Sequence, residues 1–125
     1  MSGWGASFDG KQYLNLETVR RSGQAVRTPV WFAAAPDGTL YVYTIARTGK
    51  VKRIRHTPLA RIAPCDFRGN VTGPWFDATA TLVTGPDFDF GMGLIDRKYR
   101  PLKWLLDLGF LVTRRSRVVI RLSPR

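Results

Sequence analysis

Alternation of apolar and polar residues dominates the chain, and this two-residue period is typical of β-strands with one buried face. Between residues 75 and 84, for example, Phe76, Ala78, Ala80 and Leu82 all fall on one side of such a strand. The stretch 40–45 is also rich in β-branched and aromatic residues, which favour strands. The pattern predicts six strands, which cover residues 12–20, 25–34, 40–45, 59–65, 75–84 and 117–122.

Glycine and proline mark the breaks between these strands. Gly23 lies in a turn signal at residues 21–24, and Pro-Asp-Gly-Thr at 36–39 is a second one. Two glycines and a proline make residues 67–74 a loop. Because the connections are short, neighbouring strands should be antiparallel. The sequence therefore predicts a mainly β fold with short helices, closed as a six-stranded up-and-down or Greek-key barrel.

Helices are expected where the period of the apolar residues changes. Val51 and Ile54 lie three residues apart in a basic segment that ends before Pro58, and this spacing predicts a short helix over residues 49–56. Three further segments precede the last strand, namely a linker at 85–93 and helices over 94–100 and 101–111.

Length and composition limit the class of protein. The 125 residues fit one domain, 1–125, with residues 1–10 as a short N-terminal extension. The hydrophobic content of 44% is too high for a disordered chain, and no apolar run is long enough to span a membrane. The first ten residues do not have the pattern of a secretory signal. With Cys65 as the single cysteine, an internal disulfide is excluded and a cytoplasmic location is expected.

Positive charge is the strongest compositional feature. Twenty lysines and arginines against nine acids give a formal net charge of +11, and the stretch from Arg47 to Arg61 contains no acid. Such a field attracts polyanions or a phosphorylated cofactor. His56 is the single histidine, so a histidine-based metal site or a hydrolytic triad is not expected.

Five segments follow one another in an informative order. They are VRTPVWF at 26–32, LYVYT at 40–44, TGKVKRIR at 48–55, RIAPCD at 61–66 and GPW at 73–75. This series resembles the split β-barrel flavin and deazaflavin oxidoreductases, a superfamily that includes pyridoxamine 5′-phosphate oxidase. The likeness is greatest to the actinobacterial branch that uses the deazaflavin coenzyme F420, in which a basic segment with a tyrosine resembles DRKYR at 96–100.

The resemblance implies a homodimer with two cofactor sites at the subunit interface. The second strand would line one side of the cofactor ring, largely through its backbone, at Arg27, Thr28, Pro29, Val30 and Trp31. The cofactor phosphate would be held by Thr44, Thr48, Gly49, Lys50 and Arg53, with Lys50 as the main anchor. Phe32 stands where pyridoxamine-phosphate oxidases have a further lysine, so a pyridoxal-type substrate is not expected.

The chemistry of these residues agrees with that implication. Lys50 and Arg53 lie three apart and so share a helix face, while Thr48 and Gly49 would stand at the helix N-terminus, where free N–H groups attract an anion. Pro29 cannot donate to a strand ladder, which favours an edge, a bulge or a ligand-facing position. Two aromatic side chains, Trp31 and Trp75, are candidates to pack beside the ring, although core or interface packing would also explain them.

The sequence therefore predicts an F420-dependent oxidoreductase that transfers hydride to an unidentified small organic substrate. Few catalytic side chains are needed, because the cofactor carries the reacting electrons. An FMN oxidoreductase using the same Lys50 site is the first alternative, and a non-enzymatic coenzyme-binding protein is the second. Nucleic-acid binding is not expected, because no recognition motif is present. A haem protein, with His56 as the available imidazole, is the remaining alternative.

Overall fold

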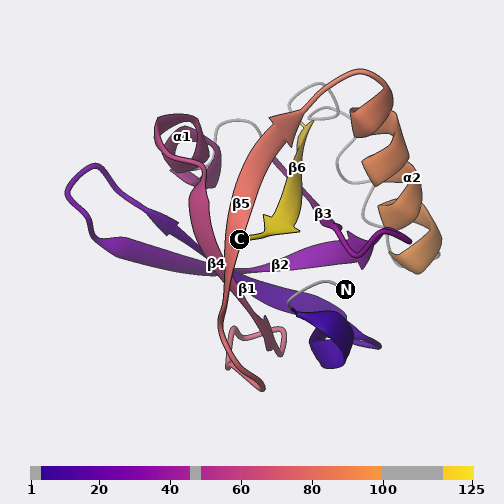
Figure 1. Ribbon diagram of the computed structural model, residues 1–125, viewed down its shortest axis with the longest axis horizontal. Helices are drawn as coiled ribbons and strands as arrows, with labels where there is room; N and C mark the ends of the chain where they lie inside the picture. The colour runs from indigo at the N-terminus through magenta and orange to yellow at the C-terminus, as the bar shows by residue number, and fades with distance from the viewer. Residues whose placement is uncertain (1–3, 46–48, 100–116) are drawn as a thin grey trace.

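A computed structural model of the protein describes residues 4–45, 49–99 and 117–125 (Figure 1). Six antiparallel strands close into a barrel in the order β1-β2-β3-β6-β5-β4, which confirms the predicted architecture. The strands are β1 (Tyr13–Val19), β2 (Ala25–Ala34), β3 (Leu40–Ile45), β4 (Leu59–Cys65), β5 (Phe76–Val83) and β6 (Arg117–Pro124). The helices are a 3-10 turn η1 (Gly5–Phe8), α1 (Gly49–His56) and α2 (Pro86–Tyr99).

The strand β2 changes its partner along its length, and this change leaves part of one of its edges unpaired within the closed barrel. Its first part, from Ala25 to Trp31, pairs with β1, whereas its last three residues, from Phe32 to Ala34, pair with β3. Beyond Val42, β3 pairs with β6 alone. Among the described residues, the first part of β2 therefore has a strand on one edge only. Pro29 lies in this part, as its missing N–H led us to expect.

The core fills the inside of the barrel with aliphatic side chains from all six strands, and Phe32 is its largest fully buried member. Trp4 and Phe8, from the segment expected to be an extension, belong to the same core, and Phe8 packs edge-on against Phe32. The indole of Trp4 donates to the carbonyl of Gly38 over 2.8 Å. The first described residues thus plug one end of the barrel, while Ile54 of α1 reaches the core from another side.

The linker predicted at 85–93 is wrong, because α2 begins at Pro86. Proline is well suited to the first helical position, and Asp87 and Asp89 complement the helix dipole in the first turn. Gly91 has a packing role in this helix. A Cβ on Gly91 would lie 2.6 Å from the ring of Tyr41, so this glycine lets α2 pack closely on β3.

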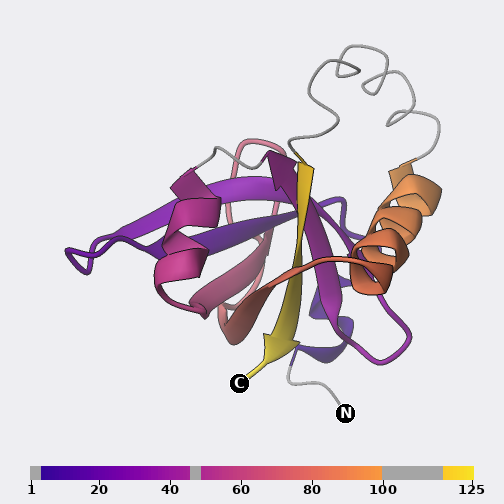
Figure 2. The ribbon, with the colours of Figure 1, turned by 90° about the horizontal axis from the view of Figure 1, so that it is seen from above.

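The helices α1 and α2 lie on opposite sides of the barrel (Figures 1 and 2). Of the helices in the described ranges, none is long and apolar enough to cross a bilayer. The helix predicted over 101–111 lies outside the described residues.

Candidate functional site

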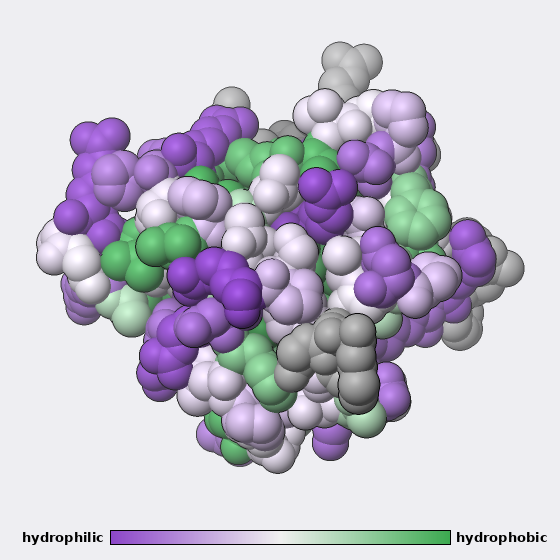
Figure 3. Space-filling model, viewed as in Figure 1, coloured by the Kyte–Doolittle hydropathy of each residue, from purple (hydrophilic) through white to green (hydrophobic). Residues whose placement is uncertain are grey.

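A hollow lined mainly by cations lies between α1 and the turn that joins β1 to β2. Its volume is about 710 Å³. The lining side chains are those of Val19, Arg20, Arg21, Lys52, Arg53, Arg55 and His56, together with the backbone of Gly49. Among the described residues, no acid lines it. In Figure 3 the upper-left part of the surface, over α1 and the β1–β2 turn, is strongly hydrophilic.

Arg53 is the most firmly placed cation of this hollow. Its Nε donates to the hydroxyl of Thr18, a residue of β1 that is 1% exposed. Gly49 allows this arrangement, because a Cβ at that position would lie 2.5 Å from a terminal guanidinium nitrogen of Arg53. Burial and the charge of Arg20 both lower the pKa of Arg53. The guanidinium is thus held in place without an acidic partner among the described residues.

Lys50 lies beside this group on α1 but does not line the hollow. It is half-buried, and it makes no ion pair or hydrogen bond within the part of the chain that the structure describes. Burial lowers its pKa, and the neighbouring charge of Arg53 lowers it further. A partly desolvated, unneutralised ammonium favours the approach of an anion, because binding restores the stabilisation that water no longer gives.

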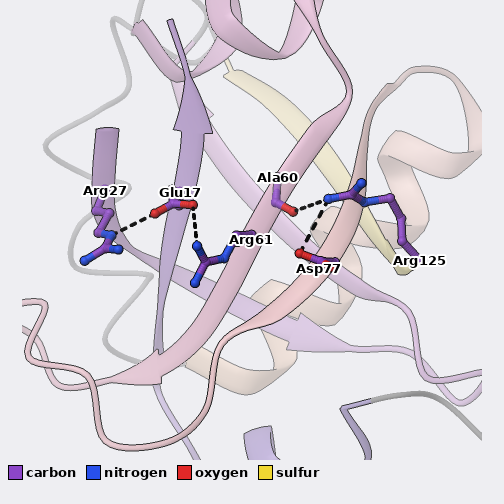
Figure 4. Close-up of polar contacts among 6 residues, drawn as sticks. All are labelled: Glu17, Arg27, Ala60, Arg61, Asp77 and Arg125. Carbon is purple, nitrogen blue, oxygen red and sulfur yellow. Dashed lines mark hydrogen bonds and ion pairs between the residues drawn. The ribbon is translucent and has the colours of Figure 1, made fainter. Parts of the chain in front are cut away.

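A second group of cations, on the outer face of the sheet, has acidic partners. Glu17 of β1 is 5% exposed and lies between Arg27 of β2, at 2.9 Å, and Arg61 of β4, at 3.5 Å (Figure 4). Both guanidinium groups also lie over the indole of Trp75, at 4.5 and 5.0 Å from its centroid. The row continues with Asp77 and Arg125, which lie 3.7 Å apart.

The predicted ring-binding residues are divided between the two faces of β2. Arg27, Pro29 and Trp31 point outward, where Trp75, Gly69 and Tyr99 respectively lie against them. Thr28 and Val30 alternate with these residues and share the core side, as Thr44 does on β3. Side chains of the described residues occupy both faces of β2. The part of this strand that remains open to a ligand is therefore its backbone edge on the side away from β1, among the described residues.

Of the predicted phosphate-binding residues, the structure brings Gly49 and Arg53 into the hollow and places Lys50 next to Arg53. Thr48 lies outside the described residues. Sequence reasoning did not include Arg20 and Arg21, which reach the hollow from the hairpin turn. Two adjacent arginines in a turn are a signal of an anion site, but the position of that turn against α1 depends on the barrel.

The described residues give little support for a catalytic acid or base, a cysteine nucleophile or a metal site. Asp66 accepts hydrogen bonds from the backbone of Arg68 and Asn70, and so it organises a loop. Burial raises the pKa of the Cys65 thiol to about 11, which makes it a poor nucleophile. No group of three histidine, cysteine or acidic side chains is placed to hold a metal ion in the described ranges.

Comparisons with protein-family models and with curated proteins find no match for this chain. Solved structures do match. A putative pyridoxamine 5′-phosphate oxidase from Listeria innocua is 17% identical with a TM-score of 0.67, over 96% of this chain and 89% of the other. This chain has the split β-barrel fold.

Two further matches share that fold but differ in their described activities. An F420 reductase is 18% identical with a TM-score of 0.65, and the match covers 100% of this chain and 95% of the other. The haem storage protein HutZ from Vibrio cholerae is 18% identical with a TM-score of 0.69, over 93% and 83% of the two chains. At these identities the likeness establishes the fold and leaves the ligand to be argued from the site.

Proposed function

We propose that the protein is an F420-dependent oxidoreductase, which reduces a small organic substrate with hydride from the reduced coenzyme. The observation that carries the proposal is the hollow beside α1, where Arg53 is anchored on Thr18 among further cations and the described lining contains no acid. The match to an F420 reductase over the whole chain supports the choice of coenzyme.

The residues present fit a phosphorylated, carboxylate-bearing coenzyme. Such a tail needs several cations along one groove. The hollow is lined by Arg20, Arg21, Lys52, Arg53 and Arg55, and none of them has an acidic partner in the part of the chain that the structure describes. Each charge-assisted hydrogen bond contributes about 1.5–3 kcal/mol, so two or three would account for micromolar affinity. FMN carries a similar phosphate and is the alternative within the same site.

Positioning is the contribution of this chain to the proposed reaction. When bound, the deazaflavin supplies the hydride. Lys50 and Arg53 would hold the phosphate at the end of β2 next to α1, and the exposed edge of β2 would hold the ring further along the strand. Between Arg27 and Trp31 the strand rises by about 13 Å, which gives room for a phosphate, a sugar-alcohol chain and a ring in sequence. No nucleophile of the protein is required.

A haem ligand is less well supported by the geometry. His56 lines the hollow, but it is surrounded there by arginines and a lysine, whereas a porphyrin requires an extended apolar surface. We therefore expect binding of a phosphorylated coenzyme in preference to haem.

Titration of the protein with F420, followed by coenzyme fluorescence, tests the proposal. We expect micromolar binding by the wild type, about tenfold weaker binding by Lys50→Ala, and oxidation of reduced F420 when an electron-poor organic acceptor is added. Lys11→Ala is the matched control, because it removes the same charge from an exposed position before β1.

Parallel titrations with FMN, haem and a DNA duplex distinguish the alternatives. Binding of FMN but not F420 would show that FMN is the coenzyme, and the proposed binding site would stay the same. Binding of DNA that disappears steeply as salt rises would indicate a non-specific effect of net charge. If the wild type and Lys50→Ala bound F420 with equal affinity, Lys50 would not be the phosphate anchor.

A further inference from the structure

The hydroxyl of Tyr99 stands where a rung of the β1–β2 ladder would otherwise be. In the register of these strands Tyr13 pairs with Trp31, so Gln12 and Phe32 would form the next pair. Instead, the Tyr99 hydroxyl accepts the N–H of Phe32 at 3.0 Å. Its proton can be donated to the carbonyl of Phe32 at 2.8 Å or to that of Gln12 at 2.5 Å. One side-chain oxygen thus bridges the two strands.

This bridge coincides with the point at which β2 changes partner. Trp31 is the last residue paired with β1 and Phe32 is the first paired with β3. The two backbone groups of Phe32 that face β1 are satisfied by Tyr99, so β1 can end there without leaving them unpaired in the interior. Tyr99 therefore ends the β1–β2 ladder and fixes where β2 diverges.

The ring of Tyr99 also fixes the side chain of Trp31. The two rings are stacked, with centroids 4.4 Å apart and planes inclined by 5°. Tyr99 is 4% exposed, and burial raises the pKa of its hydroxyl, so that it remains protonated and able to donate. Tyr99 thus holds the last side chain of the segment from Arg27 to Trp31 and the backbone of Phe32, which follows directly after it.

We propose that Tyr99 is a positioning residue for coenzyme binding: from α2 it sets the path of the β2 segment on which the coenzyme ring lies. This inference rests on the proposed function, because the role of that segment comes from it. Tyr99 itself does not contact the coenzyme in this proposal. Its effect therefore concerns the ring and leaves the anion hollow, on the other side of the barrel, unchanged.

Tyr99→Phe tests the inference because it removes the hydroxyl and keeps the ring that stacks on Trp31. We expect faster hydrogen exchange of the Phe32 amide, F420 binding weaker by about threefold to tenfold, and a shifted absorption band of bound F420. The affinity for inorganic pyrophosphate, which probes the hollow and the adjacent Lys50 without the ring site, should not change. Tyr41→Phe is the control, since Tyr41 also packs against α2 but its hydroxyl makes no hydrogen bond among the described residues.

The outcomes separate this inference from the proposed function. If the wild type binds F420 and Tyr99→Phe binds it with the same affinity and spectrum, Tyr99 has a structural role only and the inference is overturned. If the wild type binds pyrophosphate but not F420, the proposed function and the inference fall together. A loss of pyrophosphate affinity in Tyr99→Phe equal to the loss for F420 would mean general unfolding, and it too would overturn the inference.

Discussion

Two groups of arginines in this protein differ in what surrounds them. On the outer face of β1, β2 and β4, Arg27 and Arg61 flank the buried carboxylate of Glu17 and lie over Trp75. In the hollow beside α1, Arg53 is held by the neutral hydroxyl of Thr18, and the cations around it have no acidic partner among the described residues. The arginines of the first group thus share an acidic partner, whereas those of the second have none in the described part of the chain.

The difference shows why net charge alone does not locate a site. Ion pairs such as those of Glu17 are formed on folding and leave little charge to attract a ligand. Cations without partners repel one another, and this cost is recovered when an anion binds. The unpaired group is therefore the part of the +11 charge that we expect to act in binding, and the paired group is expected to act in stability.

The largest expected effect is the difference in F420 affinity between two variants, each of which lacks one arginine from one of the groups. Arg53→Met should weaken F420 binding by about tenfold to a hundredfold, because a charge-assisted hydrogen bond contributes about 1.5–3 kcal/mol. Arg61→Met removes the same charge from the paired group and should change the affinity by less than about twofold. Fluorescence titration of both variants measures the contrast. Equal losses would show that the coenzyme responds to overall charge and not to the hollow.

Replacing Glu17, the acid that Arg27 and Arg61 share, should lower stability and leave F420 affinity unchanged. Glu17→Gln leaves Arg27 and Arg61 with a neutral partner, and we expect the free energy of unfolding to fall by about 1–2 kcal/mol with F420 affinity unchanged. Urea denaturation measures the loss. Asp9→Asn is the control, because it neutralises an exposed acid that makes no ion pair among the described residues. The distinction between the two groups would be wrong if Glu17→Gln reduced binding more than stability.

Local patterns were sufficient to predict most of the fold. The alternation at 25–34 and the basic segment before Pro58 correspond to β2 and α1 with the predicted bounds. The linker predicted at 85–93 is instead the start of α2, where Gly91 admits Tyr41 of a strand distant in sequence. A tertiary contact of this kind leaves no mark in a local pattern.

The site was less predictable than the fold. Spacing identified Lys50 and Arg53 as neighbours on a helix. In the structure burial lowers the pKa of Lys50, and the charge of Arg53 lowers it further. The contribution of Arg20, Arg21 and Thr18 depends on the barrel, which brings the first hairpin against α1. Likewise, the sequence indicated Trp31 as a candidate ligand contact but could not show that Tyr99 stacks on it.

The smallest expected effect concerns the titration of Lys50. Burial and the charge of Arg53 lower its pKa from 10.5, so its ammonium loses the proton at a lower pH than that of a free lysine. Because the unfolded chain keeps that proton longer, this group makes stability rise with pH between the lowered value and 10.5. Lys50 lies next to Arg53, and we expect pyrophosphate to contact both cations, so that its binding weakens as pH rises through the lowered pKa.

Arg53→Met tests whether the charge of Arg53 contributes to the lowered pKa of Lys50, since it removes that charge and leaves Lys50 in place. The pKa of Lys50 should rise in this variant, and the loss of pyrophosphate affinity should move to higher pH, although the affinity itself is lower throughout. Titration of the Lys50 side-chain NMR signal gives the pKa directly. The same pKa in both proteins would mean that burial alone lowers it, and the two cations would then not act together on one anion.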